Sequence, residues 1–420
     1  MAIELNNDEK MENWKSYYLW LEGLFYFFQG FYFMGFQIYI SVYTAQIWVL
    51  PYQTIAMVTA VMMIPAYIKM FTGLLSDRVP IGPYGRRKPY LVFGGLLYIP
   101  AFILLVLIQD FSVIWIFVIM LVMGAWVLVD GTLDALTVDI TPDEYAKSMQ
   151  SSANAGRYLG MALGSILVGL LAPIISWPLA VILIGIFATF QVIVTMFIKE
   201  PPSMGDIDQL PLGTVLRETF GHSRSWLGFL FSLVFMGAFG MGALLGPYML
   251  QDIGLDTPTY GILIFIGSLG TVIGAMGFGI ISRKIEVSPR IYWIVTIIAW
   301  ILVTPWLLVN QAVALPYLAL ANLSLGIARG MITVLTYIIV MKLCPKSIEG
   351  FMFATLTSFM NIGLAVLAPN LVAFFEPYIG MMPALFFLVP FSIVGLLLVP
   401  KLLESPPSPE KGPEHYPELE

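Results

Sequence analysis

The chain has 420 residues, of which 59% are hydrophobic and 11% are charged, whereas about 25% of the residues of an ordinary soluble domain are charged. A soluble fold of this length cannot hide so much apolar surface, so the composition excludes one. The net charge of -6 comes largely from acids near the two ends. Cys344 is the only cysteine, and the two histidines lie far apart in polar segments. Neither an internal disulfide nor a metal cluster is therefore expected.

Long apolar runs follow one another along the chain, separated by short polar turns. About 20 apolar residues cross the hydrocarbon core of a bilayer, which leaves room for about twelve spans. The acidic first 20 residues carry no secretory signal pattern. We predict an all-α integral membrane protein with spans at residues 22–48, 52–75, 91–109, 112–140, 144–172, 177–198, 225–250, 257–282, 290–309, 312–342, 347–375 and 379–402.

The polar insert at 199–224 is the longest internal break. It is predicted to be a central cytoplasmic loop between an N-terminal bundle of six spans, 22–198, and a C-terminal bundle of six spans, 225–402. Residues 1–21 read as an interfacial N-terminal segment, because Trp and Tyr alternate there with charge. The Pro- and Glu-rich tail, 403–420, is predicted to be disordered.

The positions of lysine and arginine orient these spans. Lys69, Arg157 and Arg329 fall inside spans, and the others lie at the two ends or beside loops that follow even-numbered spans. By the positive-inside rule both ends face the cytoplasm, which requires an even number of spans. We therefore expect a multi-pass protein of the plasma (cytoplasmic) membrane with both termini in the cytoplasm.

The loop after the second span carries the most distinctive motif. Residues 73–90 read GLLSDRVPIGPYGRRKPY, and a weaker copy, GIISRK, occupies 279–284. A glycine, two residues, Ser-Asp-Arg and a closing Gly-Arg-Arg resemble the loop signature of the major facilitator superfamily. The resemblance implies twelve transmembrane helices in two pseudo-symmetric six-helix bundles and transport of a small solute by alternating access.

Two further segments narrow the resemblance. IPAYIK at 64–69 and DGTLDAL at 130–136 are similar to the folate-biopterin transporter branch and its relatives, the muropeptide permeases and the bacteriochlorophyll-delivery proteins. The loop is also similar to that of sugar–cation symporters such as melibiose carriers, which bind their coupling cation with acids in the second span. Here that span holds Lys69 and no acid between Tyr52 and Ser76.

Three functions stay open. The first is a secondary transporter of a small organic solute, coupled to protons. The alternatives are a sugar–cation symporter and a non-transporting delivery or assembly factor. An enzyme is not expected, because the chain has no phosphate-binding loop and no nucleophile elbow. We expect a monomer in the bilayer whose ligands are a small molecule and H+, without a cofactor, a metal or nucleic acid.

Charges inside the spans mark the predicted site, because a charge at the bilayer centre costs about 2.5 to 3.5 kcal/mol. Asp130 and Asp134 share one face of the fourth span. The helical rise places Asp130 and Arg157 at similar depth, so we expect these two to pair and Asp134 to face Lys69. The four residues are either static struts, or at least one carboxylate exchanges a proton during transport.

Arg329 has no acid inside the spans of its own half. We expect it to pair across the cavity, to donate to carbonyls, or to bind an anionic substrate. Other polar residues on spans expected to line the cavity are candidate substrate contacts, with interhelical hydrogen bonds as the alternative: Gln29, Tyr32, Gln37, Asn154, Asn322 and Asn361.

Charged residues around the loop are predicted to form a cytoplasmic gate. Asp139, at the end of the fourth span, lies within reach of the loop arginines, and this contact must break when that side opens. Asp77 is expected to bind the amino end of the eleventh span near Ser347, where the helix dipole favours an anion. The predicted gate residues are Gly73, Asp77, Arg78, Gly85, Arg86, Arg87 and Asp139.

Overall fold

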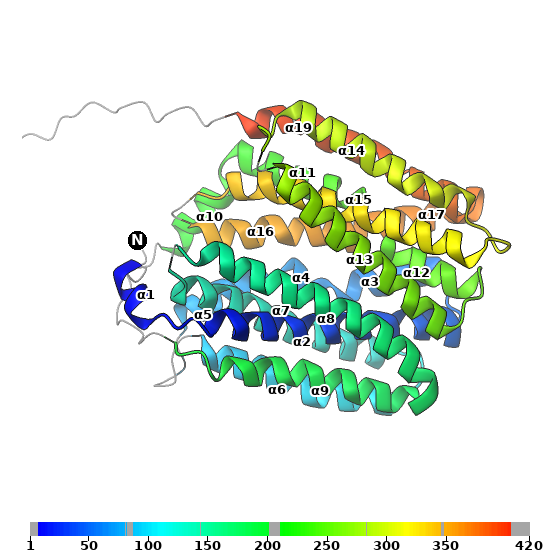
Figure 1. The fold of residues 1–420 in the computed structure, drawn as a ribbon, viewed down its shortest axis with the longest axis horizontal. Coiled ribbons are helices and arrows are strands. Elements are labelled where there is room, and N and C mark those ends of the chain that lie inside the picture. Colours follow the sequence, from blue (N-terminus) through cyan, green and yellow to red (C-terminus); the bar gives the residue numbers. More distant parts are fainter. Residues whose placement is uncertain are drawn as a thin grey trace, which may run out of the picture.

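The computed structural model describes residues 7–79, 81, 87–142, 144–200, 211–282, 284–345 and 348–404. Within them it consists of long helices that run side by side across the molecule (Figure 1). Helix α1 and the C-terminal end of α19 lie at the same end, on the left of Figure 1. We call this the termini end and the opposite one the far end.

The N-terminal group of helices follows the first six predicted spans. A short helix, α1 (Asn7–Asn13), precedes it. The group comprises α2 (Tyr18–Val42), the π-helical turn η1 (Tyr43–Ile47), α3 (Tyr52–Met62), α4 (Ile64–Tyr67), α5 (Met70–Arg78), α6 (Lys88–Leu107), α7 (Val113–Ile140), α8 (Ala146–Ile175) and α9 (Trp177–Thr195).

The C-terminal group follows the last six. Helix α10 (Leu212–Phe220) lies inside the predicted central loop and buries Val215 and Thr219, next to α11 and α16. The group comprises α11 (Ser223–Gly237), α12 (Gly242–Gln251), α13 (Thr257–Ser282), α14 (Pro289–Val303), the 3-10 turn η3 (Thr304–Leu308), α15 (Leu315–Lys342), α16 (Glu349–Ile362), the π-helical turn η5 (Gly363–Leu367), α17 (Ala368–Ile379), α18 (Met381–Phe386) and α19 (Val389–Leu403).

Ten helical segments of the described chain are long and apolar enough to cross a membrane. The other two predicted spans correspond to α2, whose tyrosines and glutamines lower its mean hydropathy, and to α3–α5. The second predicted span, 52–75, is divided into three helices. Pro65 has no N–H to donate to the carbonyl of Val61, so α3 ends at Met62. The predicted all-α membrane fold is confirmed.

Glycines permit the closest helix contacts in both groups. Where α2 crosses α8, a Cβ added at Gly160 would lie 2.0 Å from the carbonyl oxygen of Phe27. Where α13 crosses α15, a Cβ at Gly274 would lie 2.1 Å from the carbonyl oxygen of Ile327. No side chain fits at such distances, so these backbones touch only because the residue is glycine.

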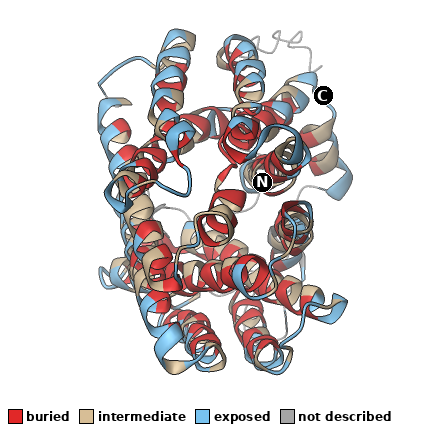
Figure 2. Cartoon of the chain, turned by 90° about the vertical axis from the view of Figure 1, so that its right-hand side faces the viewer, coloured by how far each residue is buried: buried red, intermediate tan, exposed pale blue. Residues whose placement is uncertain are grey.

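Polar contacts join the two groups at the far end, which faces the viewer in Figure 2 with buried residues on the inner sides of the helices. Gln251 Nε2 donates to the carbonyl of Leu50 at 2.9 Å. Gln53 Nε2 donates to the carbonyl of Ala373 at 3.0 Å. Two more hydrogen bonds link Tyr52 to Asp252 and Thr257 to Gln46. We call this set the far-end contacts.

Replacing Gly160 with Leu should lower the stability of the protein by about 1 to 3 kcal/mol or more, because the side chain forces α2 away from α8. The melting temperature of the purified protein in detergent measures the effect. Gly277→Leu in α13 is the control, since a Cβ there meets nothing within 4 Å. Equal losses in the two variants would contradict the packing role of Gly160.

Candidate functional site

Four charged side chains meet inside the N-terminal group. Lys69 Nζ lies 2.5 Å from Asp130 Oδ2 and 3.3 Å from Asp134 Oδ2. Arg157 Nη2 lies 3.2 Å from Asp130 Oδ1. The expected contacts of Asp130 with Arg157 and of Asp134 with Lys69 are therefore present, and Lys69 also binds Asp130. We call these four residues the charged cluster.

Local structure brings the cluster together. Asp130 and Asp134 lie one turn apart on α7, and Lys69 stands in the break between α4 and α5. Gly131 makes room for Thr72 of α5: a Cβ there would lie only 2.7 Å from the Thr72 hydroxyl oxygen, and at an ordinary contact distance of 3.5 Å from Lys69 Cε. The break in the second span places the ammonium group within reach of both carboxylates, and this glycine lets α5 lie close to α7.

Helix α2 adds two neutral donors. Gln29 Nε2 donates to Asp130 Oδ1 at 3.0 Å, and the Tyr26 hydroxyl donates to Asp134 Oδ1 at 2.5 Å. Asp130 thus binds three side chains from three different segments while only 5% of its own side chain is exposed. Two cations and two carboxylates balance, and their charge-assisted hydrogen bonds offset the cost of burial.

The cluster has a buried side and an open side. The exposed fractions of the Asp134 and Arg157 side chains are 46% and 39%, against 15% for Lys69. The Arg157 guanidinium carbon also lies 4.4 Å from the ring centre of Tyr26, a cation–π contact. Asp134 and Arg157 are therefore the members of the cluster that a solute or water can reach.

Arg329, on α15 of the C-terminal group, has an exposed side chain that pairs with no carboxylate among the described residues. A Cβ at Gly242 would lie 3.0 Å from its Nη1. Gly242 begins α12, so the guanidinium lies beside the break between α11 and α12. Tyr158, on α8, lies near both Arg157 and Arg329. This part of the molecule is suited to an anion.

Among the other predicted substrate contacts, Gln29 alone joins the charged cluster. The Tyr32 hydroxyl lies 2.6 Å from that of Tyr98, and the ring is 1% exposed. Asn322 is buried and donates to the carbonyl of Leu318 at 2.9 Å. The polar atoms of Tyr32 and Asn322 thus contact protein rather than open space. Gln37, Asn154 and Asn361 are partly buried.

Two of the predicted gate residues are in contact. Arg87 Nε lies 3.2 Å from Asp139 Oδ2, and Arg87 Nη1 donates to the Ser76 hydroxyl at 2.7 Å. Arg87 thereby ties the start of α6 to α7 and to α5. The rest of the predicted gate lies outside the described residues or side chains: Gly73, Asp77, Arg78, Gly85 and Arg86, with Ser347.

Two acids were not identified as site residues from the sequence. The Glu200 carboxylate accepts the backbone N–H groups of Arg87 at 2.6 Å and Lys88 at 3.0 Å, where the start of α6 favours an anion. No motif marks it. Glu22 is 2% exposed. The predicted first span begins at residue 22, with Glu22 at its very start, whereas α2 begins at Tyr18 and Glu22 lies one turn inside the helix. The aromatic stretch before Glu22 was the available signal for the earlier start.

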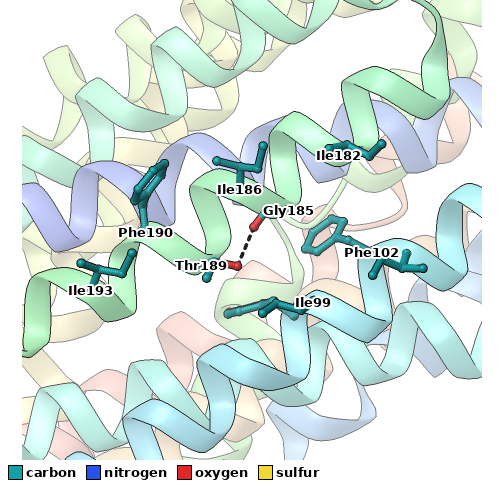
Figure 3. Close-up of a pocket in the computed structure, with 10 residues that line it drawn as sticks. Ile99, Phe102, Ile182, Gly185, Ile186, Thr189, Phe190 and Ile193 are labelled. Carbon is teal, nitrogen blue, oxygen red and sulfur yellow. Dashed lines mark hydrogen bonds between the residues drawn. The ribbon is translucent and has the colours of Figure 1, made fainter.

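A separate groove of about 380 Å³ lies between α6 and α9 (Figure 3). Its lining carries no charge, and the Thr189 hydroxyl is turned to the carbonyl of Gly185 at 2.9 Å. Ile99 and Ile186 of the lining are 45% and 42% exposed on the outer surface. Such a surface suits lipid chains, and we do not assign the groove to a polar solute.

Lys69→Met and Asp130→Asn should each destabilise the protein by about 3 to 5 kcal/mol, because each leaves a net charge in a buried cluster that was balanced. The double variant should lose clearly less than the sum of the two, since the residues share one contact. Unfolding in detergent measures these losses. Lys69→Met combined with Asp110→Asn, at an exposed turn, should give additive losses; additivity in the first pair would contradict the coupling.

Comparisons with known proteins agree with this architecture. The model of the Major Facilitator Superfamily matches residues 23–299 and 227–419. A probable folate-biopterin transporter 2 of Arabidopsis thaliana is 27% identical over 331 residues, which are 73% of this chain. The anhydromuropeptide permease of Escherichia coli (strain K12) is 24% identical over 345 residues, or 80% of this chain. The chain spans 65% and 70% of the lengths of these two relatives.

Solved structures share the fold. A mutant of the nucleoside transporter NupG has a TM-score of 0.71 at 12% identity and covers 92% of this chain and 100% of its own. A POT family transporter in complex with 5-aminolevulinic acid has a TM-score of 0.70 at 15% identity, covering 92% and 96%. The family match over both groups of helices and the shared fold lead to one conclusion: this multi-pass membrane protein belongs to the Major Facilitator Superfamily.

Proposed function

We propose that the chain is a secondary transporter that moves a small organic anion by alternating access and couples this movement to protons. One observation carries the proposal: Tyr158 lies near Arg157, on the open side of the charged cluster, and near Arg329 of the C-terminal group, which no described carboxylate neutralises. Charged groups from two groups of helices thus share one region. Membership of a superfamily that contains transporters supports the same function.

The anion is proposed to bind Arg329, which lies beside the start of α12. A carboxylate or phosphate placed there meets a cation that no described carboxylate neutralises. The relatives are named for folate, biopterin and anhydromuropeptide. Organic anions of that size are therefore the solutes to test first.

The two aspartates of the cluster are assigned different tasks. Asp130 is 5% exposed, and protonating it would weaken its bonds to both Lys69 and Arg157. Asp134 is 46% exposed, and Lys69 is the one cation of the charged cluster with which it forms an ion pair. We therefore assign proton exchange to Asp134 and anchoring of the helices to Asp130.

Alternating access requires contacts that break at each end. The far-end contacts join the two groups and have to separate before the far end opens. At the termini end, proposed to be the cytoplasmic side, Arg87 and Asp139 are proposed to hold α6, α7 and α5 together until that side opens.

Arg329→Gln should weaken binding of an anionic solute about 10- to 100-fold, since a hydrogen bond to a charged group contributes about 1.5 to 3 kcal/mol. Uptake into proteoliposomes under an imposed pH gradient, across folates, muropeptides, amino acids and sugars, measures it. Arg290→Gln, at the exposed start of α14, is the matched control. Unchanged anion uptake in Arg329→Gln would contradict the assignment. Uptake of sugars driven by sodium would favour a sugar–cation symporter, and no uptake at all a delivery factor.

Asp134→Asn should abolish accumulation driven by a pH gradient while solute exchange at equal pH continues. The amide still accepts the Tyr26 hydrogen bond, but it has no carboxyl group to take up and release a proton. Asp130→Asn should instead lower the melting temperature. If Asp130→Asn alone abolished the proton-driven step in a fully stable protein, the two assignments would have to be exchanged.

A further inference from the structure

Glu22 is a buried acid with no task in the site described above. Glu22 belongs to α2 and is 2% exposed. Oε1 accepts a hydrogen bond from the Thr137 hydroxyl at 2.9 Å. Oε2 is buried and has no hydrogen-bond partner among the described residues. A carboxylate held by a single neutral donor is poorly stabilised inside a membrane protein.

The charges around Glu22 do not compensate for this. Helix α7 presents Asp130 and Asp134, α8 presents Arg157, and Tyr26 lies one turn along α2. Helix α9, which also packs on α2, has no charged residue. Arg157 and Lys69 are already balanced by the two aspartates. A third negative charge would be uncompensated, so the carboxylic acid is the stable form of Glu22 in this conformation.

Glu22 lies next to the open side of the cluster. On α2, Glu22 and Tyr26 are one turn apart, and on α7 Asp134 and Thr137 are one turn apart. The Thr137–Glu22 hydrogen bond therefore sits one turn from the Tyr26–Asp134 hydrogen bond, on the side of the termini end. Lys10 of α1, at the termini end, donates to the carbonyl of Val138, the residue after Thr137, at 3.1 Å.

We propose that Glu22 is a second proton-binding site, which exchanges its proton with Asp134 on one side and with the solution at the termini end on the other. In the step between the two acids, the O–H bond of Glu22 breaks and an O–H bond forms on Asp134. The negative charge moves to Glu22, which then takes up a proton from solution. The inference rests on the proposed function and names the route by which the proton reaches Asp134.

Infrared spectroscopy tests the protonation state without any transport. The purified protein at neutral pH should show the C=O stretch of a buried carboxylic acid, which Glu22→Gln removes and Glu12→Gln, at an exposed position of α1, retains. Glu22→Asp keeps the acid but moves it, so the band should shift. It serves as the second variant if Glu22→Gln does not fold. A band that is absent from the wild type, or unaltered in these Glu22 variants, overturns the inference.

Proteoliposomes test the route. Glu22→Gln should lose accumulation driven by a pH gradient and keep solute exchange at equal pH, whereas Glu12→Gln should behave like the wild type. Unchanged proton-driven accumulation in Glu22→Gln overturns the inference and leaves the proposed function intact. A wild type that exchanges solutes but never accumulates them in a pH gradient overturns the proton coupling itself, so the two failures are distinguishable.

Discussion

The three hydrogen bonds of Asp130 are the contacts on which the N-terminal group depends. They join α7 to Gln29 of α2, to Lys69 in the break of the second span and to Arg157 of α8. None of these charges is tolerable alone in an apolar interior. Each is stable because the others are present, so the cluster forms as a unit and fixes how these helices lie relative to one another.

The charged cluster shows how much of the candidate site could be predicted from the sequence. The helical rise and the antiparallel course of the fourth and fifth spans predicted that Asp130 lies beside Arg157. This prediction was possible because both rules hold for any pair of connected spans. The orientations of Tyr32 and Asn322 were not predictable in this way, since a span in a bilayer is apolar toward lipid and toward its neighbours, and periodicity then no longer identifies the inner face. The first span began earlier than predicted because aromatic residues continue the helix through the interface. Pro65 marked the break in the second span in the sequence itself.

The two groups of helices are chemically unequal. The N-terminal group holds the balanced charges, with Asp130 buried and Asp134 open. The C-terminal group offers Arg329 beside the start of α12. The proton and the anion are proposed to bind on different sides of one region, with Tyr158 near an arginine of each group. In such an arrangement the charges of the two ligands would influence each other electrostatically.

The break around Lys69 has a mechanical consequence. The lysine belongs to neither α4 nor α5, and α5 leads to the termini end, where Arg87 holds it through Ser76. A tilt of α5 about this joint would carry the ammonium group along α7, toward Asp130 or toward Asp134. The short helix would then act as a lever that converts opening at the termini end into a choice of which aspartate remains neutralised.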